Sequence, residues 1–96
     1  MITHIVLFKL KDPSAEGIRK AADKLLSMAG NVEMLRHLEV GTDLIRSARS
    51  YDIALYTKFD SLEDLQAYQV HPYHGGDVAP FMREASEAVA VVDYAS

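Results

Sequence analysis

LQAYQVHPYHGGD, residues 65–77, lies where one helical pattern ends and another begins, and the order of the predicted elements depends on it. Pro72 predicts that the first helix ends near Val70, because the residue before a proline avoids the helical conformation. The two glycines that follow predict a definite break. The stretch also holds two of the four histidines, which makes it a candidate site as well as a junction.

Helical patterns flank this stretch on both sides. Upstream, Asp60 and Glu63 have the spacing of a capping box, with Asp60 as the expected N-cap. The residues at helical intervals after it are Leu62, Leu65 and Tyr68. Downstream, Asp77 is expected to cap a second segment. The apolar stripe of that segment consists of Val78, Phe81, Met82 and Ala85.

Strand patterns surround these helices. Residues 51–59 and 87–94 alternate or are rich in β-branched side chains, which predicts two strands. In the N-terminal half, residues 2–11 predict a first strand and residues 33–44 a second. Between them, Asp12-Pro13 predicts the N-cap and first position of a helix that ends at Gly30-Asn31.

The predicted order is therefore strand, helix, strand, strand, broken helix, strand. This is the ferredoxin-like βαββαβ arrangement of an α+β protein, with a four-stranded antiparallel sheet and both helices on one face. A chain of 96 residues has room for one core, so residues 1–96 are predicted to form a single domain.

The first strand is apolar on both sides, although the helices can cover only one face of the sheet. Either Ile5 and Leu7 or Val6 and Phe8 must lie on the uncovered face. An antiparallel sheet with one wet face normally alternates apolar and polar residues, and this strand does not. We therefore expect a homodimer in which two sheet faces pack together about a two-fold axis.

Composition excludes several classes of protein. The net charge is −4 and the ten basic residues are scattered, which argues against nucleic-acid binding. There is no cysteine, so disulfides, thiolate nucleophiles and thiolate metal sites are excluded. The apolar runs are far shorter than the ~20 residues of a membrane helix. The N-terminus lacks a signal-peptide pattern, and a cytoplasmic protein is expected.

Two blocks of sequence carry a resemblance. HIVLFKLK at residues 4–11 and YQVHPYH at residues 68–74 resemble the stress-responsive dimeric α/β-barrel (Dabb) family. Phe59-Asp60-Ser61 and Val92-Asp93-Tyr94 are further matches, so the resemblance covers the whole chain. It implies a ferredoxin-like monomer whose dimer closes into an α/β barrel. The family includes plant stress-induced proteins, a plant polyketide cyclase and many bacterial proteins of unassigned role.

The resemblance to the plant cyclase implies a site. His4, Tyr68 and His74 match its two histidines and helix tyrosine, while a third-strand histidine is replaced by Asp52. In an aldol condensation His74 would be the base, Tyr68 the donor to the oxyanion and His4 an orienting group. Asp52, together with His71 and Phe81, is expected to line the same pocket. No cofactor is expected.

Each candidate also has a structural interpretation. A ring nitrogen of His71 or His74 would bond a backbone group freed by the helix break, His4 would be a satisfied strand histidine, and Tyr68 a core aromatic. His71 and His74 lack a third ligand at a known spacing, so no metal site is predicted. Three functions remain open: a protein that binds a small hydrophobic or carbonyl compound between sheet and helices, a cofactor-free cyclase or lyase, and a non-catalytic structural stress-response dimer.

Overall fold

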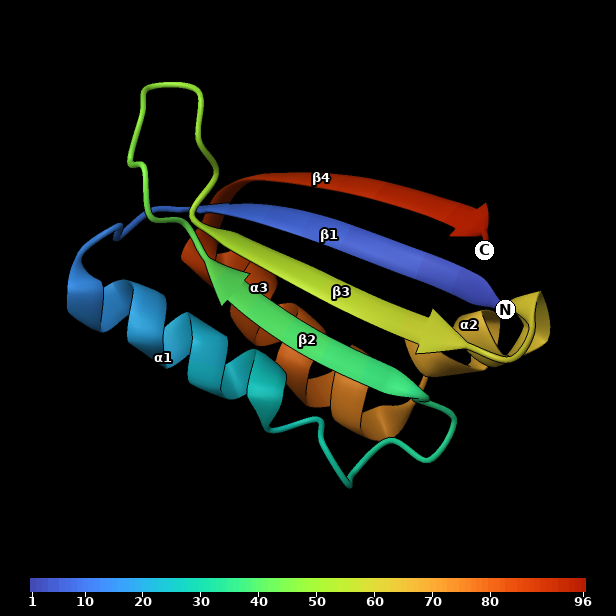
Figure 1. The fold of residues 1–96 in the computed structure, drawn as a ribbon. Helices are drawn as coiled ribbons and strands as arrows, with labels where there is room; N and C mark the ends of the chain where they lie inside the picture. Colours follow the sequence, from blue (N-terminus) through green and yellow to red (C-terminus); the bar gives the residue numbers. More distant parts are fainter.

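The computed structural model describes all 96 residues and confirms the ferredoxin-like order (Figure 1). The elements are β1 (Ile2–Leu10), α1 (Ala15–Leu26), β2 (His37–Thr42), β3 (Ile53–Phe59), α2 (Leu62–Gln69), a π-helical turn η1 (His74–Val78), α3 (Ala79–Ala85) and β4 (Ser86–Ala95). The helices lie together on one face of the sheet (Figure 1). None of the helices is both long and apolar enough to span a membrane.

The sheet has the strand order β2-β3-β1-β4, and every neighbouring pair is antiparallel. In this register Val6 lies opposite Leu55 on one side, and His4 lies opposite Asp93 on the other. The two central strands are thus β1 and β3, whereas β4 is an edge strand that pairs only with β1. Chain ends that are distant in sequence meet here, because β1 and β4 carry the two termini.

The core forms between the sheet and the helices. Val6, Phe8, Ile53 and Leu55 face the helices and are buried, which decides between the two faces that the sequence left open. From the helical side the largest fully buried side chains come from α1, α2 and the turns; they include Leu25, Met28, Tyr68 and Val78. Alternation along β1 and β3 therefore fixes which residues reach the core.

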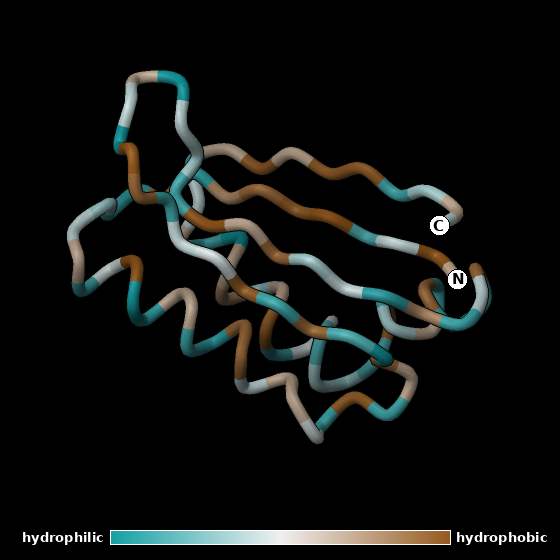
Figure 2. Tube along the Cα trace, viewed as in Figure 1, coloured by the Kyte–Doolittle hydropathy of each residue, from teal (hydrophilic) through white to brown (hydrophobic).

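The opposite face, here called the open face, carries no helix (Figure 1). Ile5 and Leu7 lie on it beside Ala54 and Tyr56 of β3, and these side chains are only half-buried. Hydrophobic residues run through the middle of β1 and β4 (Figure 2). Val92 of β4 continues the open face and is 52% exposed. One chain alone therefore leaves an apolar sheet surface in contact with water.

Two of the three predicted N-caps are wrong by one or two residues. Ser14 caps α1, because its hydroxyl accepts a hydrogen bond from Gly17 N at 3.1 Å, while Asp12 accepts from Ser14 N. Ser61 caps α2 and Asp60 instead pairs with an arginine. In each case a serine follows the aspartate closely, and the hydroxyl lies at the position from which it reaches the third amide of the helix.

Other boundaries also differ from prediction. The second strand begins at His37 rather than residue 33, and the third begins at Ile53. The glycines do not separate two helices, since η1 leads without interruption into α3. Asp77 caps no helix and pairs with Lys24. Leu62, which was expected on the apolar stripe, is largely exposed. Gly30 has the expected left-handed conformation, with φ of 79°, although α1 itself ends earlier.

Candidate functional site

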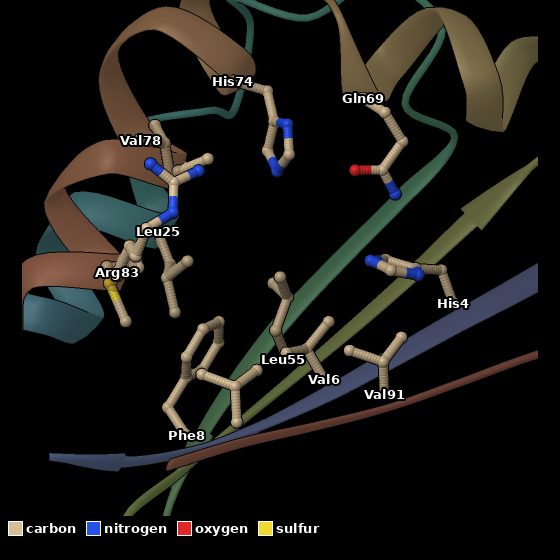
Figure 3. Close-up of a pocket in the computed structure, with 13 residues that line it drawn as sticks. His4, Val6, Phe8, Leu25, Leu55, Gln69, His74, Val78, Arg83 and Val91 are labelled. Atoms are coloured by element: carbon tan, nitrogen blue, oxygen red, sulfur yellow. The ribbon is translucent and has the colours of Figure 1, made fainter. Parts of the chain in front are cut away.

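A cavity of about 350 Å³ lies between the helix-facing side of the sheet and the segment formed by α2, η1 and α3 (Figure 3). Most of its lining is hydrophobic, with Val6, Phe8, Leu55 and Val91 supplied by the sheet. The polar side chains of the lining are His4, Gln69, His74 and Arg83. A mostly apolar cavity with a few convergent polar groups is the usual form of a small-molecule site.

His4 is held by a carboxylate across two paired strands. Its Nδ1 is bonded to an Asp93 oxygen, because the antiparallel register places the two residues directly opposite each other. The His4 side chain is buried, while that of Asp93 is 41% exposed. When Asp93 is ionised it accepts the Nδ1 proton, which leaves the Nε2 lone pair of His4 available. Figure 3 shows the His4 ring pointing into the cavity.

His74 enters the cavity from the opposite side, at the start of η1 (Figure 3). Burial lowers the pKa of His74, and the nearby Gln69 carbonyl offsets part of this shift. Its Nδ1 is buried, but no hydrogen bond of normal geometry reaches that atom. His74 is therefore a neutral imidazole with unused hydrogen-bonding capacity at the cavity wall.

Tyr68 forms the wall behind the two imidazoles and does not line the cavity. Its ring centroid lies 3.9 Å from that of His74 and 6.0 Å from that of His4. The side chain is fully buried and its hydroxyl donates to Met28 Sδ at 3.6 Å. Burial also raises the pKa of the Tyr68 phenol. His4, Tyr68 and His74 are thus brought together, but the Tyr68 hydroxyl points to Met28, in the turn after α1, and not into the cavity.

Asp52 is not part of this cavity. Its carboxylate accepts a hydrogen bond from Leu10 N at 2.7 Å and pairs with Arg46 at 2.9 Å. Leu10 is six residues from His4 along β1, which corresponds to about 20 Å at the rise of a strand. The expectation that Asp52 lines the pocket is therefore wrong. Asp52 instead anchors the loop between β2 and β3.

His71 and Phe81 also lie outside the cavity lining. Nδ1 of His71 accepts from Tyr73 N at 3.1 Å and its Nε2 lies 3.2 Å from a Glu33 oxygen, so both ring nitrogens are engaged. This is the structural role that the sequence offered as an alternative. Phe81 is exposed on α3, where the Lys24 ammonium lies 5.6 Å from its ring centroid.

Three polar residues at or beside the cavity were missed by sequence reasoning: Asp93, Gln69 and Arg83. Asp93 had a detectable signal, since it is the charged residue that follows the apolar run of residues 88–92 in the last strand. In this fold the first and last strands pair, and that pairing places an aspartate near the C-terminus beside a histidine near the N-terminus. Gln69 and Arg83 look like ordinary exposed helix residues in the sequence, and no local pattern distinguishes them.

Comparison with known proteins identifies one family over nearly the whole chain. The model of the stress responsive A/B barrel domain family matches residues 2–96. A stress-response A/B barrel domain-containing protein of Arabidopsis thaliana is 30% identical over 101 residues, which cover 98% of this chain and 36% of the plant protein. The chain thus spans about a third of that relative.

Two bacterial proteins match over nearly their full length. An uncharacterized protein of Streptomyces coelicolor is 28% identical, and the match covers 98% of this chain and 100% of that protein. The crystal structure of a dimeric protein of unknown function and ferredoxin-like fold from Bacteroides fragilis is also similar. It superposes with a TM-score of 0.83 at 31% identity, covering 99% of this chain and 95% of that chain.

Proposed function

Because the chain belongs to the stress responsive A/B barrel domain family, we propose that it binds a small hydrophobic carbonyl compound in the cavity between sheet and helices. The family description names a domain and a stress response but no reaction. The proposal therefore depends on the cavity itself and on the residues that line it.

One observation carries the proposal: an apolar cavity of about 350 Å³ receives His4, Gln69 and His74 (Figure 3). Cavities of about 150 Å³ bind benzene, so this volume suits one ring with a short chain. The Gln69 amide can donate a hydrogen bond to a carbonyl oxygen, and the imidazoles can donate or accept. An apolar ligand with one carbonyl would match both parts of the lining.

The test is a calorimetric titration with para-butylacetophenone, compared between the wild type and Val91→Trp. Val91 lines the cavity and is 55% exposed, so the larger ring can fill the cavity without disturbing the core. We expect saturable binding to the wild type and at least a tenfold loss in the variant. The control is Leu44→Trp, which introduces the same ring at an exposed position outside both the cavity and the open face and should keep the affinity. Equal affinity in the wild type and Val91→Trp would show that the compound binds elsewhere.

We also propose that the protein is a homodimer joined through the open faces of two sheets. Ile5, Leu7, Tyr56 and Val92 leave an apolar surface there that no helix covers. Burying such a surface is favourable by about 25 cal/mol per Å². The Bacteroides fragilis protein is described as dimeric, which supports a homodimer but does not identify its interface.

A second candidate function is general-base catalysis on a carbonyl compound, and the His4–Asp93 pair favours it. A histidine whose Nδ1 proton is held by a carboxylate presents Nε2 as a base. His4 Nε2 would remove a proton from the carbon next to the carbonyl, and the resulting enolate oxygen would accept hydrogen bonds from Gln69 or His74. This assignment differs from the one implied by the cyclase, in which His74 is the base.

Deuterium exchange tests the catalytic candidate without knowledge of the substrate. The methyl protons of para-butylacetophenone are followed by NMR in deuterated buffer, with and without protein. Catalysis by His4 predicts exchange that His4→Gln and Asp93→Asn abolish while the ketone still binds. Loss of exchange only in His74→Gln would assign the base to His74. Binding without exchange would leave a non-catalytic binder.

The third function, a structural stress-response dimer, is distinguished by the same titrations. It predicts a stable dimer that binds none of the carbonyl probes. The cytoplasmic location expected from the sequence stays a prediction, and fractionation of the source cells with an antibody against the protein would check it.

A further inference from the structure

Arg83 is a cationic residue that lines the cavity and has no partner within the protein. It projects from α3 beside Val78 and Leu25 in Figure 3. Its guanidinium makes no salt bridge in the structure, whereas Arg36 and Arg46 both pair with aspartates. Arg19 also lacks an ion pair, but it does not line the cavity.

No carboxylate pairs with Arg83, and none lines the cavity. Glu84, the next residue in the chain, lies 3.9 Å from the ammonium of Lys11. Asp93, at the far side of the cavity, is bonded to His4. The cavity therefore contains one fixed positive charge and no free negative charge, although the chain as a whole carries a net charge of −4.

An arginine at the edge of an apolar cavity favours a particular ligand chemistry. The guanidinium is planar and always charged, and its parallel N–H groups match the two oxygens of a carboxylate. Arg83 is exposed at the rim of the cavity, so the strength of such a pair would come from its two parallel, charge-assisted hydrogen bonds rather than from burial. Phe8, Leu55 and Val91 would meanwhile contact the apolar part of the same ligand.

Building on the proposed function, we propose that the cavity selects hydrophobic monocarboxylates, with Arg83 binding the carboxylate and the sheet residues binding the apolar body. The substrate or ligand class is then an aryl or alkyl acid of about one ring, with any carbonyl or hydroxyl group at the end near His4. The proposed function requires only an apolar ligand with a carbonyl group, whereas this proposal also requires the ligand to carry a negative charge.

A pair of probes of the same shape tests the charge requirement. para-Butylbenzoate and para-butylbenzamide are titrated separately into the wild-type protein at constant ionic strength. A bidentate pair with an exposed arginine predicts about a five- to tenfold preference for the acid. Arg83→Gln should reduce that preference to about twofold or less while its affinity for the amide stays near the wild-type value. Arg19→Gln is the matched control and should keep the full preference.

The outcomes separate the two proposals. If the amide and the acid bind the wild type equally well, the role of Arg83 is overturned and binding in the cavity stands. If para-butylacetophenone binds but neither of these probes does, the preference for a carboxylate is overturned and the proposed function stands. If none of the three compounds binds, the proposed function fails as well. If Arg19→Gln loses as much preference as Arg83→Gln, the acid responds to overall charge and the assignment to Arg83 is wrong. Circular dichroism of each variant confirms that it is folded.

Discussion

Adding one methyl group at Gly75 should move His74 and weaken ligand binding. A Cβ built at Gly75 would lie 2.8 Å from the backbone oxygen of Gln69, whereas a Cβ at Gly76 meets nothing within 4 Å. The obstructing atom is a backbone carbonyl at the end of α2, so it cannot turn aside as a flexible side chain would. In Gly75→Ala the π-helical turn must move away from α2, and His74, the preceding residue, must move with it.

The magnitude follows from comparing the two alanine variants. Replacing glycine by alanine in a helical turn stabilises the fold by up to about 1 kcal/mol, and both variants gain this. Only Gly75→Ala bears the overpacking cost of about 1–3 kcal/mol. The unfolding free energy of Gly75→Ala should thus lie about 1–3 kcal/mol below that of Gly76→Ala, or at least about 4 °C in Tm.

The assay combines thermal unfolding with titration of para-butylbenzoate at one protein concentration. Displacement of His74 removes one hydrogen-bonding group from the cavity, so the affinity of Gly75→Ala should fall about two- to tenfold. Gly76→Ala should bind as the wild type does. Equal stability and equal affinity in the two variants would refute the packing of η1 against α2 on which the position of His74 depends.

Four further predictions follow from the same contacts. Asp52→Ala should lower the unfolding free energy by about 2–4 kcal/mol, because it leaves the buried Leu10 N–H without an acceptor. Asp52→Asn keeps an acceptor and should cost only about 1 kcal/mol. Urea denaturation measures both variants, and a loss of ligand affinity without a loss of stability would contradict the anchoring role of Asp52. Val92→Lys should convert the dimer to a monomer in sedimentation at micromolar concentration, and an unchanged dimer would place the interface elsewhere. Burial lowers the pKa of His74 below its ordinary value of 6.5. As the pH drops below 6.5, the unfolded chain therefore binds a proton at His74 before the folded chain does, and the unfolding free energy should fall. His74→Asn should show a shallower decline, and a pH profile identical to that of the wild type would argue against the lowered pKa of His74. Tyr68→Phe should change stability by no more than about 1 kcal/mol, since the hydroxyl donates only to a sulfur, and abolished deuterium exchange in this variant would restore the donor role implied by the cyclase.

The order of elements was predictable because it depends on local signals. Proline, paired glycines and the alternation of β-branched residues are visible within short windows of sequence. The choice of sheet face was not predictable in this way, since β1 is apolar on both sides. Packing decided it: Val6 and Phe8 contact the helices, and Ile5 and Leu7 remain on the open face.

The site was predicted only in part, for a related reason. His4, Tyr68 and His74 were found through a resemblance, and the structure brings them together. Asp52 was assigned to the pocket by its position in the predicted third strand. The strand begins only at Ile53, so Asp52 belongs to the loop before it, whose course the strand pattern does not predict. Asp93 was missed because its contact with His4 joins residues 89 positions apart, which no local pattern contains.

The edge strand β4 links the two proposed activities physically. Val91 faces the cavity and Val92 faces the open side, and the two are nearly equally exposed, at 55% and 52%. Because β4 pairs only with β1, a second sheet packed on the open face would hold β4 in place and with it the His4–Asp93 pair. By linkage, the factor by which dimerisation raises the ligand affinity must equal the factor by which the ligand raises the dimerisation constant, when both are counted per binding site. The Val91 and Val92 variants therefore perturb opposite faces of one strand. If Val92→Lys lowers the ligand affinity only because it dissociates the dimer, the ratio of the dimer's affinity to the monomer's affinity measures that coupling directly.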